Sequence, residues 1–287
     1  MRFSADWKDF ELIDASEGEK LERWGDVLLA RPDPQVIWNT PKGAHWGKID
    51  ARYRRSAEGG GRWEQHTLKK AEWAIRYKNL RFLIRPTGFK HTGLFPEQAV
   101  NWDYMANAIQ GATRPVKELK LFAYTGGSTQ ACAAAGASVV HVDAAKGMVQ
   151  WARDNAKLSG LESAPIRWIV DDCKKFIERE IRRGNTYDGI VMDPPSYGRG
   201  PGGEVWKLED HIFALCSLVT QLLSPDALFL LLNSYTTGLS PSVMQYLLSV
   251  TAGKNKGTCT AGEIGLPVSS NGLVLPQGST AVWAGQA

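Results

Sequence analysis

The stretch Tyr187-Asp188-Gly189-Ile190-Val191-Met192-Asp193-Pro194-Pro195-Ser196-Tyr197 decides the fold class of this chain. Its apolar part predicts a buried strand, and the two prolines end that strand because they fix φ and remove backbone donors. In open α/β sheets, ligands bind at the carboxyl ends of the strands. One interpretation is therefore a stiff corner whose Pro194 carbonyl accepts hydrogen bonds from an amine and whose Tyr197 stacks on a heteroaromatic ring. The other is a plain strand-ending turn with Tyr197 packed on the core.

Helical segments and apolar strand-like runs alternate from Ala99 onward, which is typical of a parallel sheet covered on both faces. The predicted strands are 120–123, 138–142, 166–170, 189–192 and 227–233. Two further extended runs, 257–265 and 272–285, have no helix between them and predict an antiparallel hairpin at the sheet edge. We expect an α/β fold with a Rossmann-like doubly wound sheet and an antiparallel C-terminal edge hairpin.

The amino-terminal part has a different character. It is rich in tryptophan and turn residues, and residues 73–77 and 80–84 alternate as a hairpin across a Lys78-Asn79 turn. We expect a small β-rich accessory domain, residues 1–89, that could bind a substrate, followed by a sheet domain, residues 90–287.

Composition limits the class of protein. The chain has 287 residues and 43% hydrophobic content, enough for a proper core. Its first residues lack a signal-peptide core and no stretch approaches a membrane span, so we expect a soluble, cytoplasmic protein. The four cysteines are widely spaced and form no zinc-binding cluster, so we expect reduced thiols and no metal.

Basic residues concentrate between Lys48 and Lys90, where twelve lysines and arginines face four acidic residues. Tryptophans and tyrosines lie among them. This mixture is expected of a surface that neutralises phosphates and stacks bases, but the same aromatic residues also fit the core of a hairpin with arginines on its solvated face. Both interpretations stay open from the sequence.

Three predicted strands end in segments suited to a nucleoside. The first leads into Tyr124-Thr125-Gly126-Gly127, where glycines allow close approach to a helix amino terminus that suits a carboxylate or phosphate. The second ends at Asp143, where an acid commonly binds ribose hydroxyls. The third ends at Asp171-Asp172-Cys173, where a carboxylate and backbone amides could contact an adenine edge. The occurrence of all three segments in this order is stronger evidence for a nucleoside-binding site than any one of the loops alone.

These segments, from roughly Thr87 to Trp283, resemble the class I S-adenosylmethionine-dependent methyltransferases, in particular the bacterial 23S ribosomal RNA cytosine and guanine methyltransferase group. The resemblance is carried by Thr92-Gly93-Leu94-Phe95-Pro96-Glu97-Gln98, Leu121-Phe122-Ala123-Tyr124-Thr125-Gly126-Gly127, Val142-Asp143-Ala144-Ala145-Lys146 and Asp193-Pro194-Pro195-Ser196-Tyr197-Gly198. It implies that residues 90–287 form an S-adenosylmethionine-binding methyltransferase domain and that the substrate is RNA, most plausibly ribosomal RNA.

The resemblance also implies roles for individual residues. Phe95 and Gln98 would lie over the cofactor, and Tyr124, Thr125, Gly126 and Gly127 would cradle its methionine part. Asp143 would bind the ribose, Asp172 and Cys173 would lie at the adenine, and Asp193 would sit beside the transferred methyl group. Asp193 and the Pro194 carbonyl would then orient an amine while Tyr197 stacks on the base.

Two departures from the family bear on the reaction. The cytosine-5 members carry an attacking cysteine near the end of a late strand, where this chain has Asn233-Ser234-Tyr235-Thr236-Thr237, and Cys216 fits a core position. A covalent cytosine-5 mechanism is disfavoured, which leaves a base nitrogen as the expected acceptor. The second departure is Ala99-Val100-Asn101-Trp102, where relatives often have an arginine after the glutamine; no role is carried over there.

Alternatives remain within and outside the enzyme class. The acceptor could be a protein amide or a small-molecule amine, or the chain could be a catalytically silent RNA-binding relative. A nicotinamide dehydrogenase is the remaining Rossmann alternative, but the spaced Gly-x-Gly-x-x-Gly pattern is missing and the Asp-Pro-Pro-Ser-Tyr loop would have no function in it. The segment 199–209 is a candidate lid, in which Arg199 and Lys207 could contact phosphate and Trp206 could either close the pocket or anchor the following helix. His91 and His211 receive no role.

Overall fold

The computed structural model describes residues 1–56, 60–199, 205–253 and 255–286, and it separates into two compact units. Unit 1 comprises Met1–Val100 with Gly265–Gln277, and unit 2 comprises Asn101–Ile264 with Gly278–Ala287. The division therefore falls later than the predicted boundary after residue 89. It also assigns the tip of the C-terminal hairpin to unit 1, which no local sequence signal indicates. No described helix is long and apolar enough to cross a membrane.

Unit 1 is built on a sheet with the order β1-β2-β3-β4-β5, in which only β3 and β4 pair in parallel. Its strands and short helices are β1 (Phe10–Ser16), β2 (Glu19–Trp24), β3 (Val27–Pro32), η1 (Ala44–Lys48), β4 (Ala51–Arg55), β5 (Gly61–Gln65), β6 (Trp73–Tyr77), β7 (Leu80–Ile84) and η2 (Pro96–Gln98). The β6–β7 hairpin has the predicted bounds, and its turn residue Lys78 has φ 52°. Its alternating apolar side chains are buried, which confirms the hairpin interpretation of this segment.

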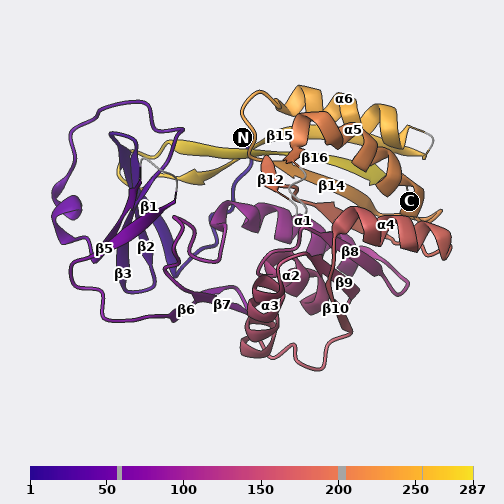
Figure 1. Cartoon of the computed structure of the whole chain (residues 1–287), viewed down its shortest axis with the longest axis horizontal. Coiled ribbons are helices and arrows are strands. Elements are labelled where there is room, and N and C mark those ends of the chain that lie inside the picture. Colours follow the sequence, from indigo (N-terminus) through magenta and orange to yellow (C-terminus); the bar gives the residue numbers. More distant parts are fainter. Residues whose placement is uncertain (57–59, 200–204, 254, 287) are drawn as a thin grey trace. The chain divides into compact units, whose positions relative to one another are not determined.

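Unit 2 contains the doubly wound sheet, with the order β10-β9-β8-β11-β14-β16-β15 among the described strands (Figure 1). Its elements are α1 (Ala99–Gly111, which begins in unit 1), β8 (Lys117–Leu121), α2 (Gly127–Ala134), β9 (Ser138–Asp143), α3 (Lys146–Leu158), β10 (Ile166–Val170), α4 (Cys173–Arg182), β11 (Gly189–Met192), β12 (Tyr197–Arg199), β13 (Val205–Lys207), α5 (Leu208–Val219), η3 (Thr220–Leu222), β14 (Phe229–Ser234), α6 (Pro241–Ala252), β15 (Gly257–Pro267) and β16 (Val274–Gly285). Strands β8 to β11 and β14 are parallel, and β16 joins β14 antiparallel, as predicted.

Side chains alternate between the two faces of the parallel strands. Leu119, Leu121, Ile190 and Met192 belong to an apolar core shared with α4, α5 and α6. Cys216 of α5 is fully buried in this core, as predicted. Covering helices on both faces exclude water from the central strands, which explains why they read as apolar runs.

The bounds predicted for the strand 120–123 are wrong, because β8 begins at Lys117 and ends at Leu121. The strand carries two buried charged residues, Glu118 and Lys120, which form an ion pair between the sheet and the helices α1 and α2. Charged residues are almost never fully buried unless they are paired. Because two of its buried residues are charged, β8 does not appear as an apolar run in the sequence, although it is a central strand of the sheet.

Candidate functional site

The parallel sheet reverses its strand order between β8 and β11. From β8 the chain proceeds to β9 and β10 on one side, whereas β11 and β14 lie on the other. Ligands of open α/β sheets bind at this switch point, outside the carboxyl ends of the strands. The loop after β8 and the corner Asp193–Tyr197 both begin there, and the Asp193 amide donates to the Leu121 carbonyl over 3.4 Å. The structure thus brings two predicted site segments together.

The loop after β8 has an unusual backbone. Phe122 (φ 56°) and Tyr124 (φ 51°) both adopt the left-handed conformation, which is uncommon for non-glycine residues. Two hydrogen bonds hold the loop: the Tyr124 amide donates to Asp143 Oδ2 over 2.9 Å, and Asn155 Nδ2 donates to the Thr125 carbonyl over 2.9 Å. Strain of this kind costs about 1–3 kcal/mol per residue and clusters at ligand sites.

The two glycines of this loop are required for different reasons. Gly126 is the N-cap of α2 with φ 82°, and no side chain caps the amides of the first turn. A Cβ at Gly127 would lie 2.7 Å from Cζ2 of Trp102, so this glycine is needed for packing against α1. Uncapped amides at a helix N-terminus attract carboxylates and phosphates. The backbone conformation of Gly126 therefore suits ligand binding, whereas the requirement for glycine at position 127 is explained by its packing against Trp102.

Asp143 lies at the carboxyl end of β9 and is half-buried. One carboxylate oxygen accepts from the Tyr124 amide, and the other accepts from the Ala145 amide over 2.9 Å. Each carboxylate oxygen has a second acceptor position. The side chain is therefore fixed in direction while it can still accept from ribose hydroxyls.

The acids after β10 differ in environment. Asp172 is the exposed N-cap of α4 and accepts from the Lys175 amide over 2.9 Å, whereas Asp171 pairs with Arg179. Cys173 is buried, and burial raises the pKa of its thiol, which accepts from the Phe122 amide over 3.3 Å. The Cys173 side chain is engaged with the β8 loop through the Phe122 amide, so an adenine contact here would involve the backbone of Cys173.

Two buried polar residues under the β8 loop escaped the sequence analysis. Asn155 sits at i+4 from buried Trp151 on the covered face of α3, and this polar residue in an apolar stripe was the available signal. His141 is fully buried in β9 and forms a 2.9 Å hydrogen bond with Thr129. Burial, with a smaller contribution from Arg153, lowers the pKa of His141 to about 3, so the imidazole is neutral.

The corner after β11 is braced by side chains and backbone from three segments. Trp206 Nε1 donates to the Pro195 carbonyl over 2.7 Å, the Leu208 amide donates to the Ser196 carbonyl over 3.0 Å, and the Ser196 and Thr236 hydroxyls are 2.6 Å apart. The Trp206 ring also stacks on His211 of α5, with centroids 4.9 Å apart. Trp206 therefore anchors the corner to the following helix. The Arg199 side chain and residues 200–204 lie outside the described part of the chain.

The predicted catalytic residues differ in exposure. Pro194 is buried, Asp193 is half-buried, and Tyr197 is 51% exposed. An exposed ring beside a half-buried carboxylate is not the core residue that the strand-ending alternative requires. Tyr197 thus has a surface on which a base could stack.

Three of the four cysteines are buried and unsuited to nucleophilic attack. Cys132, Cys173 and Cys216 are buried, and burial raises the pKa of Cys216 to about 12. Where the cytosine-5 relatives carry their cysteine, Asn233 instead accepts from Asn101 (3.1 Å) and Thr280 (2.7 Å) in a buried polar cluster. Only a thiolate is a good nucleophile, so these protonated thiols do not support covalent attack.

Phe95 and Gln98 belong to unit 1, whereas the other predicted cofactor residues belong to unit 2. Phe95 is half-buried and packs against His91, with ring centroids 5.2 Å apart. Gln98 is buried at the end of η2, and its backbone N–H donates to the Phe95 carbonyl over 3.1 Å. The two residues share one rigid turn, and their predicted role over the cofactor stays a prediction.

Comparison with known families identifies the family to which the chain belongs. A family model described as S-adenosylmethionine-dependent methyltransferase matches residues 16–252. The chain belongs to this family. Its cofactor is therefore S-adenosylmethionine, the methyl donor.

Individual relatives agree with this assignment. The chain is 29% identical over 215 residues to the ribosomal RNA large subunit methyltransferase K/L of Shewanella frigidimarina, covering 74% of this chain and 28% of that protein. The corresponding protein of Shewanella baltica is 30% identical over 206 residues, covering 71% and 27%. The chain thus spans about a quarter of the length of the curated relatives it matches.

Solved structures confirm the fold. The crystal structure of the SAM-dependent methyltransferase from Agrobacterium tumefaciens has a TM-score of 0.93 and 41% identity, over 99% of this chain and 92% of that one. A second structure, determined with SAH, has a TM-score of 0.75 at 17% identity and covers 98% and 76%. The methyltransferase fold is therefore shared over nearly the whole chain.

The residues of unit 2 fit the cofactor. The uncapped α2 terminus suits the methionine carboxylate, and Asp143 retains acceptor positions for hydroxyls. Within the described ranges, no group of three histidine, cysteine, aspartate or glutamate residues could hold a metal ion.

Proposed function

We propose that this methyltransferase modifies a base nitrogen in RNA, with ribosomal RNA as its substrate. The relatives named for the ribosomal large subunit support this substrate class at 29–30% identity. The observation that carries the reaction is the braced Asp193-Pro194 corner beside the β8 loop. An RNA substrate also implies that the protein acts in the cytoplasm.

The chain's own residues would position the acceptor. Bound S-adenosylmethionine supplies a sulfonium-activated methyl group. The Asp193 carboxylate and the Pro194 carbonyl accept hydrogen bonds from an exocyclic amine, which turns the nitrogen lone pair toward that methyl group. Correct alignment of two reactants can be worth about 7–11 kcal/mol of the barrier.

Asp193 has a second task because the nitrogen becomes positively charged as the bond forms. A fixed carboxylate stabilises that developing charge without reorganising, and Tyr197 holds the base by stacking. A base from a duplex or stacked loop must first be turned out, at a cost of a few kcal/mol. Contacts between unit 1 and the RNA would offset this cost.

A nitrogen acceptor agrees with the cysteine environments. Cytosine-5 transfer needs a thiolate to activate the ring, and the buried thiols near the sheet are held protonated. An exocyclic amine needs no covalent activation, only orientation and charge stabilisation.

The test compares RNA from a strain lacking the gene with RNA from its parent. Mass-spectrometric mapping should show one methylated base missing from ribosomal RNA, and the purified protein with radiolabelled S-adenosylmethionine should restore it. Methylation that persists undiminished in ribonuclease-treated extract would instead indicate a protein or small-molecule acceptor. Absence of S-adenosylmethionine binding by calorimetry would indicate a catalytically silent protein.

A further inference from the structure

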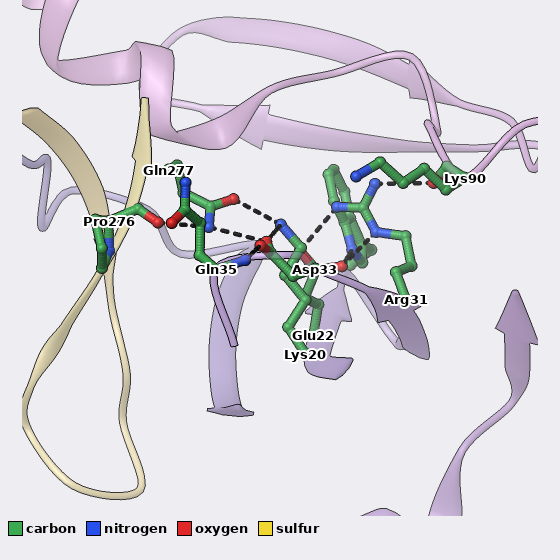
Figure 2. Close-up of polar contacts among 9 residues, drawn as sticks. Lys20, Glu22, Arg31, Asp33, Gln35, Lys90, Pro276 and Gln277 are labelled. Carbon is green, nitrogen blue, oxygen red and sulfur yellow. Dashed lines mark hydrogen bonds and ion pairs between the residues drawn. The ribbon is translucent and has the colours of Figure 1, made fainter. Parts of the chain in front are cut away.

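Unit 1 contains a buried ionic network built from β2, the end of β3 and Gln277 (Figure 2). The Glu22 carboxylate accepts from Arg31 Nε (2.6 Å) and Nη2 (2.8 Å). Lys20 lies 3.4 Å from Glu22 and 3.2 Å from Asp33, and its ammonium donates to Gln277 over 2.7 Å. These two cations and two carboxylates balance in charge.

Lys90 adds a positive charge that the network does not neutralise. Its carbonyl accepts from Arg31 Nη1 over 3.1 Å, which fixes its backbone to the network. Its side chain extends beside Arg31, and no described carboxylate forms an ion pair with its ammonium (Figure 2). Burial, then the positive charges of Lys20, Arg31 and Arg55, lower the pKa of Lys90 to about 8, against an opposing contribution from Asp33. The ammonium is thus half-buried among cations.

Asp33 supplies an opposite charge to Lys90, but this carboxylate is already paired with Lys20 over 3.2 Å. Glu97 is buried, and burial raises the pKa of its carboxyl, which favours the neutral acid. Burial beside Arg31 and Lys90 lowers the pKa of His91 to about 3, so this imidazole is neutral. A partly buried cation without a partner is costly. An anionic ligand would remove that cost.

Several other basic residues of the region 48–90 are paired with acids. Arg54 pairs with Glu64 (3.1 Å), Lys70 with Asp26 (2.6 Å), Lys78 with Asp6 (3.0 Å) and Arg85 with Glu72 (2.7 Å). Of these four acids, only Asp26 and Asp6 lie outside the region, so most of the local excess of basic over acidic residues remains. Arg55, at the end of β4, is exposed and makes no ion pair with any described residue. The Tyr53 hydroxyl, two residues earlier in β4, donates to the Gly88 carbonyl over 3.1 Å, which brings the end of β4 to the segment that carries Lys90.

We propose that Lys90 and Arg55 form a subsite for a phosphodiester of the RNA substrate. The inference rests on the proposed function. The Lys90 ammonium serves as a point charge on a fixed backbone, and the Arg55 guanidinium offers a planar fork that matches two phosphate oxygens. The balanced network behind them keeps Lys90 in place without competing for the anion.

The experiment measures binding of the full chain to a 20-nucleotide oligouridine at a series of salt concentrations. The Lys90→Gln variant should lower the slope of log affinity against log salt by about 0.7, the value for one lost phosphate contact on a single strand. Arg55→Gln should have a similar effect, and Lys90→Arg should restore the slope. S-adenosylmethionine affinity should not change in these variants.

The matched control is Lys70→Gln, which removes the same charge from unit 1 but takes it from an ion pair with Asp26. Its slope should equal that of the wild type. An unchanged slope in Lys90→Gln, an equal loss in Lys70→Gln, or a loss of cofactor affinity in place of RNA affinity would each overturn the subsite. If the wild type bound no RNA, the proposed RNA substrate would fail together with it.

Discussion

The two loops at the switch point of the sheet are held by different means. The β8 loop depends on backbone conformation: Phe122, Tyr124 and Gly126 all have positive φ, and buried Asn155 and half-buried Asp143 fix them from outside. The corner after β11 depends on proline stiffness and on braces from Trp206, Leu208 and Thr236. We infer that the first loop is shaped to bind a cofactor and the second to orient a reacting group. Mutations should therefore separate binding from turnover.

The largest effect is expected at the reacting corner. Asp193→Ala should lower kcat by at least about 10²–10³-fold, because it removes the carboxylate that orients the amine and stabilises its charge. The S-adenosylmethionine affinity measured by calorimetry should stay close to that of the wild type. Full turnover in this variant would contradict the role of Asp193, and a lost affinity would place Asp193 in the cofactor site.

The next effect is expected in the β8 loop. Gly126→Ala places a Cβ at φ 82° and 3.0 Å from the Ala152 Cβ, so it should cost about 1–2 kcal/mol and weaken S-adenosylmethionine binding about tenfold. Gly136→Ala is the matched control, with φ 100° and no atom within 4 Å of the added Cβ. The control should lose stability in denaturant without losing cofactor affinity. Equal affinities of the two variants would refute a special role for the Gly126 backbone.

A smaller effect is expected from the brace on the corner. Trp206→Phe keeps an aromatic ring beside His211 but removes the bond to the Pro195 carbonyl, which is worth about 0.5–1.5 kcal/mol. Turnover should fall about 2–10-fold, with an unchanged KM for S-adenosylmethionine. Trp38→Phe loses a comparable indole bond, to the Ala15 carbonyl over 2.8 Å, and should leave kcat unchanged. A rise in KM for the cofactor with kcat preserved would show that Trp206 does not act through the corner.

The smallest effect at neutral pH concerns the support of the β8 loop. His141 is neutral in the folded state because its pKa lies at about 3, whereas the unfolded chain takes up a proton below its ordinary value of 6.5. The unfolded state thus binds more protons between these values, so the free energy of unfolding falls as pH falls, by up to about 1.4 kcal/mol per pH unit.

His141→Gln should flatten this acid dependence in denaturant titrations between pH 6.5 and 4. The variant of an exposed histidine, His66→Gln, should keep the slope of the wild type. If His141→Gln showed the same acid slope as the wild type, the neutral buried imidazole would not be its source.

Much of unit 2 could be predicted from the sequence, because most of its strands are short apolar runs that end in distinctive residues. The bounds predicted for 166–170 and 189–192 match β10 and β11. The β8 strand was misplaced because Lys117, Glu118 and Lys120 mimic a surface segment, although the last two are buried as an ion pair. The braces Trp206 and Thr236 and the support Asn155 act over contacts distant in sequence, which no local pattern reveals.

By itself, the sequence determined the class of fold, the order of the strand-end loops and the residues that face the switch point, because hydrophobic period, glycine and proline act locally. Tertiary structure decided what those residues are free to do. It buried Cys132, Cys173 and Cys216, and this burial raises the pKa of their thiols. It used Gly127 for packing against Trp102 and paired several basic residues of unit 1 with acids, whereas no described carboxylate forms an ion pair with the Lys90 ammonium. Burial and pairing depend on residues far apart in sequence, and these interactions set the charge and reactivity of each group.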